Sequence, residues 1–190
     1  MFVLKKKYFL IIESIKNFEL KNIKKRNKFC IIYRNNKKPD NLTHLINFRK
    51  SCKQKGIEFF VANNHKLAVI LKADGIYLSS FNRTLKSLAL KKSNYQLIGS
   101  AHNIKEITLK IKQGCSLIFL SKLFVVSYDR KAPYLGVIKF NISLKLNKNL
   151  IPLGGINQDT LNSLKQINCK GLALLSEVKK KTANIINRLF

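Results

Sequence analysis

The sequence predicts an α/β fold built on a parallel sheet, and three observations support this prediction. Strand-like apolar segments alternate with helix-like segments from one end of the 190-residue chain to the other, which is typical of such folds. Most strand-like segments are continuous apolar runs, as expected for parallel strands that are covered on both faces. Because eight of these units follow one another, the pattern fits either a (β/α)8 barrel or a doubly wound sheet.

Eight short segments rich in Ile, Val, Phe and Tyr are the expected strands. They cover residues 8–13, 29–34, 57–63, 75–80, 96–101, 117–124, 150–154 and 172–176. Helices are expected over residues 41–55, 65–72, 103–113, 159–168 and 181–190. A barrel of this type typically has about 250 residues, so several helices of this shorter chain must be reduced, especially in residues 134–147.

The helix expected over residues 103–113 has the clearest boundaries. Asn103 is a suitable N-cap residue, and Gly114 suits the position just after the last turn, where glycine tolerates a left-handed backbone. The apolar positions are Ile104, Ile107 and Ile111, and this spacing predicts an amphipathic helix.

The composition indicates one globular domain over residues 1–190. Hydrophobic residues make up 46% of the chain, and no Gly-, Pro- or Ser-rich linker divides it, which favours a single core. No apolar run reaches the roughly 18 residues that a membrane helix needs. The basic N-terminus runs into Glu13 without a small-residue cleavage pattern, so we expect a cytoplasmic protein without a signal peptide.

The four cysteines are expected to be small buried side chains rather than metal ligands. Cys30, Cys52, Cys115 and Cys169 lie far apart in the sequence, and no C-x-x-C pair suggests a zinc site or redox chemistry. Free cysteine is among the most frequently buried residue types.

The formal net charge of +28 invites a nucleic-acid-binding interpretation, because lysine and arginine supply non-specific phosphate affinity. Only six of the 37 basic residues are arginine, and the lysines are spread through the chain together with many Asn and Ile residues. This distribution indicates a codon bias toward A·T and a solvated basic surface. No aromatic stripe, zinc finger or basic heptad accompanies the charge, so nucleic acid is the least favoured partner.

Two strand ends in the second half of the chain suggest a phosphate site. Gly154 and Gly155 close the seventh expected strand, and their missing side chains allow an anion to approach backbone N–H groups. Ser176 closes the eighth strand and offers an N–H group and a hydroxyl. Because barrels commonly bind phosphate at these two loops, we predict that an anion binds between the glycine pair and Ser176.

Five segments together resemble the thiamine phosphate synthase and thiazole tautomerase family. They are Ala-Asp-Gly at residues 73–75, Gly-Ser-Ala-His at 99–102 with Glu106, Leu-Ile-Phe-Leu-Ser at 117–121, Pro-Leu-Gly-Gly-Ile at 152–156 and Gly-Leu-Ala-Leu-Leu-Ser at 171–176. The resemblance spans roughly residues 28–178, and Tyr33-Arg34 is similar to a divergent branch found mainly in alphaproteobacteria. It implies a single compact (β/α)8 TIM barrel with reduced helices.

The resemblance also implies a reaction. Such enzymes join hydroxymethylpyrimidine diphosphate to thiazole phosphate and release pyrophosphate, leaving thiamine phosphate, by way of a pyrimidine carbocation. This chemistry requires positive charge around the leaving group rather than a strong base. Two alternatives stay open, a tautomerase-like or phosphate-binding barrel that has lost the metal-dependent step, and a basic nucleic-acid-binding protein.

Site residues follow from the same resemblance. Arg34 matches a diphosphate ligand, and Ser100 and His102 match the strand-five segment that faces the pyrimidine, so Arg34 and Ser100 are the expected catalytic residues. The thiazole phosphate cradle corresponds to Gly154, Gly155 and Ser176. Further basic residues expected near the phosphates are Lys37, Lys122, Arg130 and Lys131. Lys122 stands where the tautomerases have a catalytic histidine.

Magnesium is the cofactor that the resemblance implies, and here the chain departs from the family. Asn63 and Asn82 align with the two aspartates that hold Mg²⁺. An amide oxygen adds no charge, whereas Mg²⁺ is normally bound by one or two carboxylates plus phosphates. We therefore expect the ion to arrive mainly with the diphosphate, and any synthase activity to need unusually high Mg²⁺. The double substitution Asn63→Asp with Asn82→Asp is expected to lower that requirement.

Overall fold

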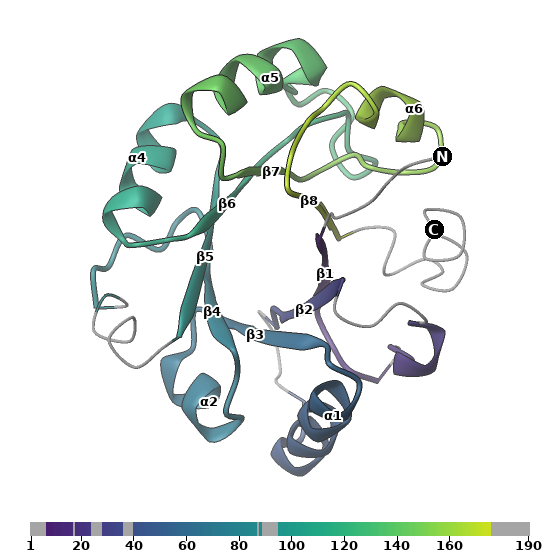
Figure 1. Ribbon diagram of the computed structural model, residues 1–190, viewed down its shortest axis with the longest axis vertical. Helices are drawn as coiled ribbons and strands as arrows, with labels where there is room; N and C mark the ends of the chain where they lie inside the picture. The colour runs from purple at the N-terminus through teal and green to yellow at the C-terminus, as the bar shows by residue number, and fades with distance from the viewer. Residues whose placement is uncertain are drawn as a thin grey trace.

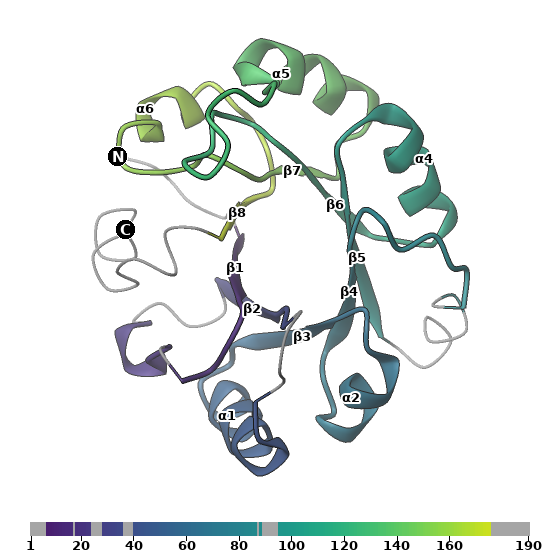
Figure 2. The same cartoon turned by 180° about the vertical axis from the view of Figure 1, so that it is seen from behind.

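The strands form a nearly closed parallel barrel. The computed structural model describes residues 7–16, 18–23, 28–35, 40–86, 88 and 95–175. Within these residues eight parallel strands form one sheet in the order β7-β6-β5-β4-β3-β2-β1-β8, and a parallel bridge between Leu153 and Ala173 joins β7 to β8. Figures 1 and 2 show the ring of strands with the helices outside it. The predicted (β/α)8 barrel is confirmed, and the doubly wound sheet is excluded.

All eight expected strands are present, with ends shifted by a few residues. The strands are β1 Lys7–Ile12, β2 Phe29–Tyr33, β3 Glu58–Ala62, β4 Gly75–Leu78, β5 Gln96–Ala101, β6 Leu117–Leu120, β7 Leu150–Pro152 and β8 Gly171–Leu174. The helices are η1 Leu20–Asn22, α1 Leu42–Gln54, α2 His65–Ile70, α4 Ile104–Lys112, α5 Gly136–Leu146 and α6 Leu161–Leu164. The helix expected over residues 181–190 lies outside the described residues.

The prediction that residues 134–147 hold a strongly reduced helix is wrong. Helix α5 has 11 residues, whereas α2 has six and α6 has four. Phe140 and Leu144 lie one turn apart and are buried, while Ile138, Ile142 and Leu146 on the other side are exposed. Because apolar residues occur all round this helix, its helical period is hidden in the sequence.

Helix α4 has the predicted ends but a different buried face. The Asn103 side chain caps it by accepting a hydrogen bond from the Glu106 N–H at 2.9 Å, and Gly114 has a φ of 79°. Ile104 is 69% exposed, whereas Lys110 is fully buried. The apolar face expected from the sequence is therefore only partly the face that packs on the sheet.

Two hydrophobic clusters lie on opposite faces of the sheet. Alternate residues along each strand point to opposite faces, and one cluster consists only of strand and strand-end residues, so it fills the barrel. Its fully buried members include Phe9, Ile11, Cys30, Ile32, Phe60, Tyr77, Ile98, Phe119 and Ile151. The other cluster combines the remaining strand residues with helix residues such as Leu45 and Phe140. Packed side chains thus fill the barrel below its carboxyl-terminal opening.

The described residues contain neither a disulfide bond nor a helix with the length and hydropathy needed to cross a bilayer. Cys30, Cys52 and Cys169 are buried, as predicted, and Cys115 is half-buried. Burial raises the pKa of Cys52 to about 12. The Cys52 thiol therefore stays protonated at neutral pH.

One ion pair joins α1 to the start of β4, at the end of the barrel where the strands begin. Nη2 of Arg49 donates to Oδ1 of Asp74 at 2.8 Å, and Oδ2 of Asp74 accepts the Phe59 N–H at 2.7 Å. We expect Asp74→Ala to lower the free energy of unfolding by about 3 kcal/mol, because the buried Arg49 guanidinium keeps only its hydrogen bonds to the Lys72 oxygen and loses its counter-charge, and the Phe59 N–H loses its acceptor. The melting temperature should fall by about 6–12 °C.

The ion pair between Lys7 and Glu58 is the control for this prediction. Their side chains are 40% and 38% exposed, and pairs of this kind contribute less than about 1 kcal/mol. Glu58→Gln should therefore change the melting temperature by no more than about 4 °C. Equal losses in the two variants would contradict the role assigned to Asp74.

Candidate functional site

A cavity of about 210 Å³ opens at the carboxyl-terminal ends of the strands. The residues that line it lie near the carboxyl-terminal ends of β4, β5 and β8 or in the segments that follow β2, β4, β5, β6, β7 and β8. Barrel enzymes place their active sites at this end, so the cavity is the candidate active site.

Strand alternation explains which side chains reach the cavity. Ile32 and Ile98 point into the barrel, so residues two positions further along point the same way. Arg34 and Ser100 occupy those positions, and both line the cavity. The alternation also brings the buried Tyr77 to its floor.

Arg34 carries a buried donor without an acceptor. Its Nε atom is buried and has no hydrogen-bond partner among the described residues. An unpaired buried donor is costly and rare in native proteins, so this nitrogen marks a place where an acceptor binds. Burial raises the pKa of the neighbouring Tyr77, while hydrogen bonding to Ser100 and the charge of Arg34 act in the opposite direction. The Tyr77 phenol is therefore protonated at neutral pH.

The turn after β7 presents unpaired backbone donors. Gly154 and Gly155 have φ angles of 96° and 67°, and their carbonyl oxygens accept hydrogen bonds from the Phe124 N–H and the Thr160 hydroxyl. The bridge between Leu153 and Ala173 uses the Gly154 N–H, whereas within the described part of the chain the N–H groups of Gly155 and Ile156 donate no hydrogen bond. Successive free N–H groups in such a turn form a concave anion-binding nest.

Lys122 lines the same cavity next to this turn. Its Nζ lies 3.0 Å from Oδ2 of Asp129 and 5.7 Å from the centre of the Tyr128 ring. The carboxylate partly compensates the lysine charge. Arg130 and Lys131, which follow Asp129, are exposed and do not line the cavity.

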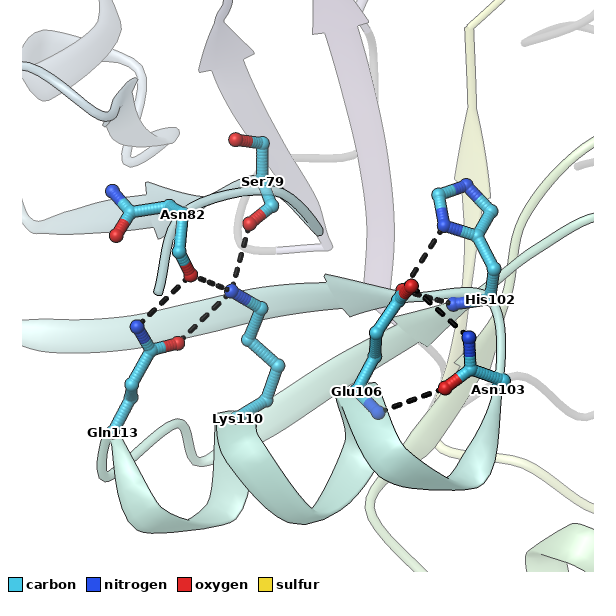
Figure 3. A network of polar contacts seen from close by, with 7 residues as sticks. All are labelled: Ser79, Asn82, His102, Asn103, Glu106, Lys110 and Gln113. Carbon is cyan, nitrogen blue, oxygen red and sulfur yellow. Dashed lines mark hydrogen bonds and ion pairs between the residues drawn. The ribbon is translucent and has the colours of Figure 1, made fainter. Parts of the chain in front are cut away.

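His102 is held by the first turn of α4. Oε2 of Glu106 accepts the His102 N–H at 2.8 Å and lies 3.1 Å from the ring Nδ1, as Figure 3 shows. Partial burial alone would raise the pKa of Glu106, but the hydrogen bonds from His102 outweigh it and the pKa is lowered. A carboxylate beside Nδ1 keeps a proton on that nitrogen and leaves Nε2 available at the cavity.

The structure thus gathers part of the predicted site. The predicted residues that line the cavity are Arg34, Ser100, His102, Lys122, Gly154 and Gly155. Lys37 and Ser176 lie outside the described residues, so the anion site predicted between the glycine pair and Ser176 is described only on the glycine side. Tyr77, Ser121 and Tyr128 also line the cavity and were not predicted, although strand alternation in residues 75–78 would have indicated Tyr77.

Asn63 and Asn82 do not line the cavity, and their side-chain oxygens already have partners. Oδ1 of Asn63 accepts the Ser79 N–H and Nδ2 of Asn82, both at 3.1 Å, which uses both of its lone pairs. Oδ1 of Asn82 accepts the Thr84 N–H at 3.2 Å. No group of three or more His, Cys, Asp or Glu side chains able to hold a metal occurs among the described residues. These residues do not fit a magnesium site, and the predicted magnesium requirement stays a prediction.

Comparison with known proteins relates this site to one family. Residues 11–178 match the family model described as thiamine monophosphate synthase. A thiamine-phosphate synthase from Prochlorococcus marinus is 26% identical over 152 residues, which are 78% of this chain and 44% of that protein. Another, from Prochlorococcus marinus subsp. pastoris, is 30% identical over 139 residues, which are 72% of this chain and 40% of that protein.

A solved structure agrees at the level of the fold. The thiamine phosphate pyrophosphorylase from Pyrococcus furiosus superposes with a TM-score of 0.70, at 18% sequence identity, over 97% of this chain and 96% of that chain. By contrast, this chain spans only about two fifths of the length of the two Prochlorococcus relatives. The activity of those longer proteins therefore does not transfer to it directly.

Proposed function

The chain belongs to the thiamine monophosphate synthase family, and we propose that it joins hydroxymethylpyrimidine diphosphate to thiazole phosphate with release of pyrophosphate. One observation carries the proposal. The Nε of Arg34 and the N–H groups of Gly155 and Ile156, which have no partner among the described residues, belong to one cavity. Two separate sets of anion donors suit a reaction between two phosphorylated substrates.

The chemistry assigns a clear role to Arg34. The bond between the pyrimidine methylene carbon and the diphosphate oxygen breaks, and its electron pair leaves with the diphosphate. The lone pair of the thiazole nitrogen then forms the new C–N bond, so no proton has to be removed. Arg34 stabilises the charge that grows on the leaving oxygen, while Ser100 and Tyr77 offer hydroxyl groups to the heterocycle.

The glycine turn after β7 holds the phosphate of the second substrate in this proposal. The backbone N–H groups of Gly155 and Ile156 bind the phosphate without a counter-charge, and Lys122 adds a cation that Asp129 releases when an anion arrives. Both substrates are charged small molecules. The same proposal places the reaction in the cytoplasm, because phosphate esters do not cross membranes unaided.

Turnover with purified protein tests the proposal. The protein is incubated with both precursors and Mg²⁺, and thiamine phosphate and pyrophosphate are measured. The proposal predicts that the two products appear in equal amounts. Binding of thiazole phosphate without turnover would instead identify a phosphate-binding barrel, and salt-sensitive binding of generic RNA alone would favour the nucleic-acid alternative.

A further inference from the structure

Lys110 is a cation buried against the outside of the barrel. Its side chain is fully buried, and Nζ donates to the backbone oxygens of Ser79 and Asn82, both at 2.7 Å, and to Oε1 of Gln113 at 2.9 Å. Figure 3 shows the lysine reaching from α4 to the loop that follows β4. Ser79 also lines the cavity, so this ammonium group lies directly behind the site wall.

The three acceptors favour the charged form of the lysine. An ammonium group has three N–H donors, whereas a neutral amine has only two and would turn its lone pair toward one of the oxygens. Burial lowers the pKa of Lys110, with Cys115 and Glu106 acting in the opposite direction. No carboxylate lies within ion-pair distance of Lys110 among the described residues.

The fold provides a slot for the lysine stem. A Cβ atom on Gly99 would lie 2.7 Å from Cδ and 2.9 Å from Cγ of Lys110. Gly99 is in β5, where its N- and C-terminal neighbours Ile98 and Ser100 point into the barrel. The missing side chain on the outer face therefore lets the lysine lie flat against the strand on its way to the loop.

The loop after β4 is held by hydrogen bonds from two sides. On the helix side Gln113 adds hydrogen bonds from Nε2 to the oxygens of Asn82 at 3.0 Å and Thr84 at 2.7 Å. On the side of β3, Asn63 bonds to Ser79 and Asn82. The segment that carries one of the two family metal positions is thus organised by protein groups alone, with a lysine at its centre.

We infer that the buried ammonium group of Lys110 takes over part of the role that the family resemblance assigns to a divalent ion. It orders residues 79–84 and places a fixed positive charge behind the cavity, where low surrounding polarity strengthens its attraction for a bound diphosphate. The identification of that anion as a diphosphate rests on the proposed function. The inference predicts that this site binds pyrophosphate without any metal.

Pyrophosphate binding in the presence of EDTA tests the inference, with calorimetry on the full-length protein. Wild type should bind, and Lys110→Met should bind at least about tenfold more weakly, because a fixed charge near the anion is lost. Lys112→Met is the matched control, since Lys112 belongs to the same helix but is exposed. It removes the same charge from the protein and should bind like wild type.

A rescue variant separates the role of the charge from a purely structural role. Nδ2 of Asn82 lies 3.1 Å from Oδ1 of Asn63, so Asn63→Asp with Asn82→Asp places two carboxylates side by side. Combined with Lys110→Met, this exchange should restore pyrophosphate binding only when Mg²⁺ is added. Mg²⁺ alone should bind to the double aspartate variant and not to wild type.

Several outcomes would overturn the inference. It fails if wild type loses pyrophosphate binding in EDTA, a result that does not depend on how any variant folds. It also fails if Lys110→Met binds as well as Lys112→Met, or if Mg²⁺ does not restore binding to the rescue variant. If Lys110→Met does not fold, Gly99→Ala replaces it, because the added methyl group displaces the lysine stem and should also weaken binding.

The proposed function and this inference fail in different ways. Wild type that binds pyrophosphate in EDTA but forms no thiamine phosphate refutes the synthase proposal and leaves the role of Lys110 intact. Wild type that forms thiamine phosphate but binds pyrophosphate only with Mg²⁺ refutes the role of Lys110 alone.

Discussion

Arg34→Ala should lower the rate of thiamine phosphate formation by about 10²–10³-fold, the usual effect of removing one donor to a developing negative charge. Arg34 supplies a buried Nε that has no partner among the described residues, and an anion in the cavity gives it one. Steady-state kinetics with both precursors measures the effect. The loss should appear mainly in kcat, because the charge on the leaving oxygen grows as the bond to carbon breaks.

Thermal unfolding distinguishes this role from a structural one. Because the Arg34 Nε has no partner among the described residues, Arg34→Ala should not lower the melting temperature and can raise it. Arg34→Lys keeps the charge but cannot offer a planar set of donors, so its rate should lie between those of wild type and Arg34→Ala. A rate unchanged in Arg34→Ala would remove Arg34 from the mechanism.

Gly155→Ala should cost about 3 kcal/mol of the free energy of unfolding, through two separate effects. The φ angle of 67° is unfavourable for alanine, at about 1 kcal/mol. An added Cβ would also lie 2.5 Å from the Val125 oxygen and 2.6 Å from the Phe124 carbonyl group, and relieving such overpacking costs about 2 kcal/mol. The melting temperature should fall by about 6–12 °C.

Gly136→Ala is the matched control because it has the backbone cost without the clash. Gly136 has a φ of 69°, and its added Cβ meets no atom within 4 Å. We expect this variant to lose about 1 kcal/mol. Phosphate binding should also fall in Gly155→Ala and not in Gly136→Ala, since only Gly155 belongs to the anion-binding turn. Equal stability losses in the two variants would show that the close contact with residues 124–125 does not contribute to the loss of stability in Gly155→Ala.

The resemblance to the family, rather than a pattern of strands, led to the prediction that Arg34 and Ser100 belong to one site. Both side chains line the cavity at the carboxyl-terminal ends of the parallel strands, where barrel enzymes place their active sites. The glycine pair was predicted from the lack of side chains alone. A glycine at position 155 is also needed because the backbone of Phe124 and Val125 approaches it closely. Those residues lie 31 and 30 positions earlier, so this contact has no local signal in the sequence.

Helix α4 shows where prediction from the sequence stops. Its ends are set by local hydrogen bonds at Asn103 and by the left-handed backbone of Gly114, so the sequence identifies them. Its buried face is not set locally, because Lys110 is buried while Ile104 and Ile111 are exposed. Any pattern of hydrophobicity predicts that a lysine lies on the surface. The burial of Lys110 becomes favourable because Gly99 leaves space for its stem and the carbonyl groups of Ser79 and Asn82 accept hydrogen bonds from its ammonium group.

The order of strands and helices follows from the sequence alone, because it depends on backbone periodicity and on residue type, which are properties of neighbouring positions along the chain. The resemblance to the family adds that asparagines stand where the family has two metal-binding aspartates. The tertiary structure alone decided that Asn63 and Asn82 bond to each other and that Lys110 fills the space behind them. These contacts join residues 19 to 31 positions apart, and their energies depend on how well burial and hydrogen bonding match in space.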